Sequence, residues 1–221
     1  TRDASYMTYL ELVNAVLRRL RITEVGSVNE TAYSAMVGDF VNDSKSMVED
    51  SHDWSALRTT LTVTTSEDIF NYALTGSQNN IKMLDVINDT SNNFMTYRPS
   101  TWMNNVFLNE TPTTGSPTYY SFNGVDSNGD TLVDIYPIPD AVFALRFNCI
   151  LRNPDLVEDT DQLVIPSRPV VQAAVALTAR ERGETGGTST AEYFAIADSF
   201  LSDAIALDAN RHPEDLIFRV I

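Results

Sequence analysis

The chain has 221 residues, of which 30 are acidic and 15 are basic, so its formal net charge at pH 7 is −15. Such a charge repels phosphate groups and argues against tight nucleic-acid binding by counterion release. The single cysteine, Cys149, excludes a disulfide framework and a multi-cysteine metal site. No apolar run approaches the roughly 18 residues of a membrane span, and no signal-peptide pattern opens the sequence, so we expect a soluble cytoplasmic product without membrane contact.

The N-terminal part predicts two amphipathic helices. Between Ser5 and Leu20 apolar side chains recur every three or four residues, which places them on one face of a helix. A second helix is predicted from about Asn29 to His52, with Trp54 closing it. Its length requires packing along a whole face, against the first helix or against a neighbouring subunit.

After Trp54 the pattern changes to strands. Leu57, Leu61 and Val63 alternate with polar residues in a threonine-rich run. Further strands are predicted at residues 69–74, 81–88, 94–98, 118–123, 131–136 and 141–151, with a short helix at 99–108. Short strands at these intervals suggest a small sandwich or barrel-like sheet.

The C-terminal part returns to helices. Pro166 ends the strand-rich region, and Pro169 suits the first turn of a third helix. Residues 189–192, Ser-Thr-Ala-Glu, fit a capping box at the start of a fourth helix, which ends before Pro213. We therefore expect an α+β fold, in which residues 1–56 and 166–210 form a helical bundle, residues 57–165 form an inserted antiparallel β-rich module, and residues 211–221 form a tail.

Two glycine-containing motifs have ordinary structural interpretations. Residues 126–130, Asp-Ser-Asn-Gly-Asp, resemble the start of a calcium loop, but Pro137 stands where a bidentate glutamate is needed. Asn-Gly between two predicted strands favours a hairpin instead. Residues 183–189 precede a helix but contain no lysine and follow another helix, which favours a helix–helix connection over a phosphate site.

No set of residues has the spacing of a catalytic or metal site. His52 and His212 are the only histidines, and neither lies in a nucleophile or metal motif. A carboxylate pair such as Asp134 and Asp140 could in principle serve a glycosidase, but with 30 acidic residues some pair always has a suitable spacing. We therefore expect no enzyme activity and no cofactor.

The tail is the strongest candidate for a binding segment. Five of its last six residues are large and apolar, and each would cost about 1.5–3 kcal/mol to leave in water; they are Leu216, Ile217, Phe218, Val220 and Ile221. One interpretation is a final strand that docks on its own domain. The other is docking onto another subunit or a partner protein, with the polar residues 211–215 as a hinge-like lead.

The order of elements resembles the head-to-tail adaptor proteins of tailed bacteriophages, in particular the podovirus tail tubular protein A family. The similar features are an N-terminal helix like Tyr9–Leu17, the motif Asp53-Trp54-x-x-Leu57 before a threonine-rich strand, and a Tyr136-Pro137 step at the end of a strand. The resemblance covers nearly the whole chain in the order of its elements.

The resemblance implies a structural connector in the neck of a virion, made in the host cytoplasm. Such adaptors form a ring, typically a dodecamer, beneath the portal protein, and double-stranded DNA passes through the ring without tight binding. Their helices pack side by side around a channel, and a downstream tail or nozzle protein follows. An extended C-terminal segment grips the portal in related adaptors, and this role falls here on Leu216, Ile217, Phe218, Val220 and Ile221.

Two other function classes remain open at this point. The first is a monomeric virion module that recognises a carbohydrate or a host surface, with Trp102, Tyr119, Tyr120 or Phe122 as stacking platforms. Aromatic residues at alternating strand positions are more often core residues, which makes this the second choice. The other class is a cell-wall hydrolase, for which the sequence offers only uncommitted carboxylates.

Overall fold

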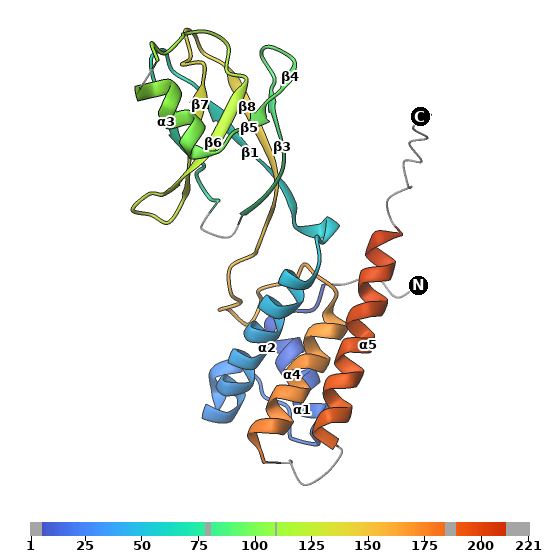
Figure 1. Ribbon diagram of the computed structural model, residues 1–221. Coiled ribbons are helices and arrows are strands. Elements are labelled where there is room, and N and C mark those ends of the chain that lie inside the picture. The colour runs from blue at the N-terminus through green and yellow to red at the C-terminus, as the bar shows by residue number, and fades with distance from the viewer. Residues whose placement is uncertain (1–5, 78–80, 109, 184–188, 211–221) are drawn as a thin grey trace, which may run out of the picture. The chain divides into compact units, whose positions relative to one another are not determined.

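The computed structural model describes residues 6–77, 81–108, 110–183 and 189–210 (Figure 1). The chain divides into two compact units, one formed by Thr1–Leu57 with Asn153–Ile221 and the other by Arg58–Arg152. We call them the helical unit and the β unit. Their contents confirm the predicted α+β fold, with helices from both ends of the chain in one body and a sheet-rich module between them.

The described residues of the helical unit form four long helices. They are α1 (Tyr9–Arg19), α2 (Ala32–Ser51), α4 (Ser167–Glu181) and α5 (Ser189–Ala209), with short 3-10 turns η1 (Val28–Glu30) and η2 (Ser55–Leu57). Helix α4 packs against each of the other three and lies between α2 and α5 (Figure 1). Its small buried residues Ala174, Ala176 and Ala179 allow this close packing on several sides.

Both N-terminal helices begin later than their apolar periodicity predicts, because threonine caps set their first residues. Thr8 and Glu11 form a capping box, in which each side chain accepts a hydrogen bond from the other residue's backbone amide. Thr31 and Ser34 form the equivalent box on α2, and the extended backbone of Thr31 separates that helix from η1. Helix α1 therefore starts at Tyr9 instead of Ser5, and α2 at Ala32 instead of Asn29.

The β unit is a sandwich of two four-stranded sheets. The first has the order β1 (Arg58–Thr64), β8 (Ala144–Leu151), β3 (Ile81–Asn88) and β4 (Asn93–Phe94), and the second has the order β2 (Asn71–Ala73), β7 (Thr131–Tyr136), β6 (Tyr119–Val125) and β5 (Thr96–Tyr97). Buried side chains of both sheets form one core, including Leu145 and Phe147 from the first and Val133 and Ile135 from the second. Helix α3 (Ser100–Leu108) contacts β6.

Three features of the β unit differ from or refine the expectations. Strand 94–98 is split, because the chain crosses from one sheet to the other at the buried residue Met95. The pairing of β5 with β6 is parallel, so the module is not wholly antiparallel. The predicted hairpin is confirmed: β6 and β7 pair antiparallel, Gly129 has a φ of +86°, and Asp126 accepts backbone hydrogen bonds from Asn128 and Asp130.

Residues 153–165 belong with the helices, although the sequence pattern assigned them to the β-rich module. The backbone amide of Tyr9 donates to the carbonyl of Asp161 at 2.8 Å, and that of Leu163 donates to Met7 at 3.0 Å. Asn42 of α2 exchanges two hydrogen bonds with the backbone of Leu156. The first two bonds flank an isolated antiparallel bridge between Thr8 and Gln162. Together these bonds satisfy the backbone of a segment that lies outside both sheets, and the boundary of the β unit falls at Arg152.

In the described part of the chain, no helix combines the length and the apolar composition needed to cross a membrane. Within the same residues, no group of three or more His, Cys, Asp or Glu side chains could hold a metal ion. The tail, residues 211–221, and most of the glycine-rich connection, residues 184–188, lie outside the described residues.

Candidate functional site

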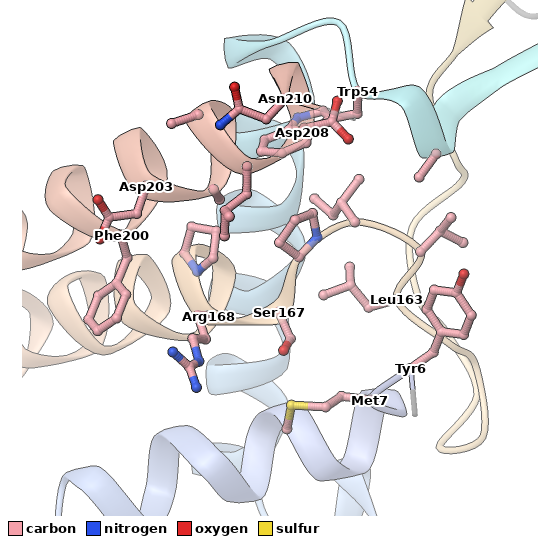
Figure 2. Close-up of a pocket in the computed structure, with 18 residues that line it drawn as sticks. Tyr6, Met7, Trp54, Leu163, Ser167, Arg168, Phe200, Asp203, Asp208 and Asn210 are labelled. Atoms are coloured by element: carbon pink, nitrogen blue, oxygen red, sulfur yellow. The ribbon is translucent and has the colours of Figure 1, made fainter. Parts of the chain in front are cut away.

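A groove of about 800 Å³ opens on the helical unit beside the C-terminal half of α5 (Figure 2). We call it the α5 groove. Four segments line it: the residues before α1, the residues after α2, the segment 163–169 that leads into and begins α4, and the C-terminal half of α5 with Asn210. Leu163 and Ile165 are buried at 1% and 3% exposure, whereas Tyr6 and Leu207 are 55% and 70% exposed.

The composition of α5 explains why the groove is apolar. Ala197, Ala204 and Asp208 are buried, as expected for the side of the helix that packs in the bundle. Phe200 and Leu207, seven residues apart, lie on a neighbouring stripe and line the groove. The helix is thus apolar on more than the face that packs inside its own unit, which is typical of a helix that also meets a partner.

Asp208 connects the end of α5 to the segment after α2. Its carboxylate accepts a hydrogen bond from the Ser55 backbone amide at 2.9 Å and from the Ser55 hydroxyl at 2.6 Å. The His52 Nε2 atom lies 3.3 Å from the same carboxylate. Asp208 is 6% exposed, so these contacts are shielded from water and hold the C-terminal end of α5 against residues 52–55.

Ser55, His52 and Asp208 are the residue types of a hydrolase triad, but their arrangement does not activate a nucleophile. In a triad the histidine accepts the serine proton and the aspartate orients the histidine. Here the Ser55 hydroxyl donates directly to Asp208. The group therefore acts as a structural connection between α5 and residues 52–55.

The tryptophan motif has a structural role in the same region. Trp54 is completely buried, and its indole nitrogen donates to the carbonyl of Val48 at 2.7 Å. Its ring meets His52 edge to face with 5.0 Å between centroids. The Asp53-Trp54-x-x-Leu57 motif follows the end of α2 at Ser51, and it supplies Trp54 and Ala56 to the lining of the α5 groove.

The residues for which the family resemblance implies portal binding lie outside the described residues; they are Leu216, Ile217, Phe218, Val220 and Ile221. The last described residue, Asn210, lines the α5 groove (Figure 2). The groove itself was not predicted. The spacing of Phe200 and Leu207 could have indicated an extra apolar stripe, but the contributions of Tyr6 and Leu163 depend on the tertiary structure.

The aromatic residues considered as binding platforms are packed against one another in the β unit. The Trp102 ring of α3 lies 5.1 Å from the Tyr119 ring and 5.8 Å from the Tyr136 ring. The Arg98 guanidinium lies over both Trp102 and Tyr119, at 5.3 and 4.9 Å from the ring centroids. These contacts attach α3 to the second sheet by edge-to-face and cation–π packing.

Comparison with known proteins identifies the family. The family model described as SU10 adaptor protein matches residues 7–215, which include all of the β unit and all described helices. A search of curated proteins found no match. The family match confirms the resemblance to phage head-to-tail adaptors and indicates a virion component that associates with other head or tail proteins. This family consists of structural adaptors and is not a class of enzymes. The chain therefore belongs to the SU10 adaptor protein family of phage adaptor proteins.

Proposed function

We propose that the protein is the head-to-tail connector of a tailed phage. In this role it forms a ring beneath the portal, joins the DNA-filled head to the downstream tail or nozzle protein, and lets double-stranded DNA pass. The observation that carries the proposal is the adaptor-family match over residues 7–215, which extends through both units. The resemblance to podovirus adaptors implies a dodecamer.

The helical unit offers two separate surfaces for lateral contacts in such a ring. Met47 on α2 and Ile196 on α5 are large apolar residues with 57% and 44% exposure. Helix α4 lies between α2 and α5 (Figure 1). Contact of the α2 side of one copy with the α5 side of the next is heterologous, and heterologous contacts generate rings when the rotation closes.

In this proposal the apolar tail residues 216–221 bind the portal. Deleting residues 211–221 should abolish portal binding and leave the fold intact, because the last described helix ends at Ala209. Sedimentation velocity of subunit–portal mixtures measures the binding, and circular dichroism measures the fold. A matched control, Glu214→Gln with Asp215→Asn, keeps the apolar residues and should still bind. Normal portal binding by the truncated protein would refute this role of the tail.

The proposal also predicts weak interaction with DNA. With a net charge of −15 the protein lacks the basic excess that drives counterion release. Fluorescence anisotropy with duplex DNA at physiological salt should therefore give a dissociation constant weaker than about 10⁻⁴ M, the upper end of ordinary non-specific binding. Micromolar binding would contradict passage without retention.

A further inference from the structure

The α5 groove has an apolar lining that the described residues leave partly uncovered. Leu207 and Tyr6 are 70% and 55% exposed although they line a groove that also contains the buried residues Leu163 and Ile165. Apolar side chains collected in a concave site are typical of a surface that receives another segment. The ring contacts proposed above use Met47 and Ile196, neither of which lines this groove.

We propose that the α5 groove of a subunit not yet bound to a portal holds the tail residues 216–221 of the same chain. The tail begins at the groove, because Asn210 is one of its lining residues. Residue 216 follows six positions later, within a reach of about 20 Å at roughly 3.3 Å per residue. So short a tether gives the tail an effective concentration in the millimolar range at the groove.

The side-chain chemistry favours residues 216–221 over residues 1–5 as the segment that occupies the groove. Residues 1–5, Thr-Arg-Asp-Ala-Ser, precede Tyr6 but contain no large apolar side chain. Residues 216–221 contain five large apolar side chains and one cation, Arg219. Two exposed charges of opposite sign line the groove, Arg168 of α4 and Asp203 of α5, and the Asp203 carboxylate supplies a complementary charge for Arg219.

If the proposed function holds, on which this step rests, the tail can bind either the α5 groove or the portal, but not both. The same five apolar residues cannot occupy the groove and the portal together. Portal binding must therefore draw on the fraction of subunits whose tail is released, which lowers the apparent affinity by that fraction. Storage in the groove also covers a β-prone apolar segment that would otherwise promote association between free subunits.

Chymotrypsin cleavage after Phe218 in the full-length chain tests the proposal without any portal. Cleavage requires the Phe218 ring to enter the protease, so its rate follows the fraction of released tails when opening is fast. Leu207→Glu and Tyr6→Ser change two different segments that line the groove. Each should raise the released fraction of tails, and with it the initial cleavage rate, by about tenfold. Val157→Glu is the matched control, because Val157 is 67% exposed in the same unit but does not line the groove.

The outcomes distinguish this proposal from its alternatives. The proposal is supported if wild-type cleavage is slow and independent of protein concentration, and if it is faster in both groove variants but not in the control. Equal rates in all four proteins would overturn it, and so would protection that disappears on dilution, which would assign the groove to the tail of a second copy. Both groove residues are more than half exposed, and thermal melts by circular dichroism verify that the variants are folded. A protected tail without portal binding would refute only the proposed function, whereas an unprotected tail with normal portal binding would refute only this inference.

Discussion

Replacement of Asp208 by alanine should destabilise the helical unit. The change removes the acceptor for the Ser55 amide and hydroxyl and the partner of His52. Hydrogen bonds to a charged group contribute about 1.5–3 kcal/mol each when they are buried. Asp208 is 6% exposed, so solvent screening reduces these contributions only slightly.

Two opposing effects reduce the total. An acidic residue in the last turn of a helix is unfavourable by about 0.3–1 kcal/mol, and alanine removes that repulsion. Alanine also removes the cost of keeping a carboxylate out of water. The hydrogen bonds still dominate, because the variant leaves the Ser55 amide without its acceptor. We expect the free energy of unfolding to fall by about 2–3 kcal/mol.

The assay uses the separate locations of the two tryptophans. Trp54 lies buried in the helical unit and Trp102 lies in the β unit, so a Trp102→Phe background isolates the fluorescence of Trp54. Urea unfolding should show a lower midpoint with an unchanged m-value. Asp203→Ala, an exposed acid on the same helix, is the control and should change stability by less than about 0.5 kcal/mol. An equally small effect of Asp208→Ala would refute the role assigned to this carboxylate.

Three further predictions concern the packing of α1 and α2. Gly38→Ala should destabilise the protein by about 1–3 kcal/mol, although alanine has the better helix propensity. The added Cβ would overlap the Tyr9 hydroxyl and lie 2.9 Å from Val28 Cγ1. Adding Tyr9→Phe to the same chain should recover part of the lost stability, as measured by urea unfolding. Burial, with smaller effects of nearby aspartates, raises the pKa of Tyr9 from 10.0 to about 12. The neutral Tyr9 side chain therefore contributes fully to the free energy of unfolding below pH 10, and this contribution is lost as the pH rises through 12. The free energy of unfolding should fall by about 2–3 kcal/mol over that window in wild type but less in Tyr9→Phe. Identical pH profiles of the two proteins would contradict this. Lys45→Ala should lower the free energy of unfolding by about 3–5 kcal/mol, because it removes the ammonium group that lies 3.2 Å from the buried Glu49 carboxylate. Thermal and urea unfolding measure this loss. The double variant Lys45→Met with Glu49→Leu should be much closer to wild type, and equal losses in both variants would argue against an ion-pair effect.

Residue patterns predicted the elements that depend on local physics. The helices and most strands follow from periodicity, and the hairpin at Asn128-Gly129 follows from the backbone freedom of glycine at a positive φ. Threonine caps moved the starts of α1 and α2, because a side-chain oxygen that accepts from the first turn outweighs the apolar stripe in setting a boundary. These corrections are local and change no topology.

The sequence alone determined the fold class and the order of helices around an inserted β module. The spacing of apolar residues, every second residue in strands and every third or fourth in helices, shows which face of each element is apolar. Only the tertiary structure decided which segments share a surface. Ser55 and Asp208 meet across 153 positions, and residues 153–165 join the helices through backbone bonds that have no periodic signature. The α5 groove depends on the tertiary structure, because its lining comes from four segments that only long-range packing brings together.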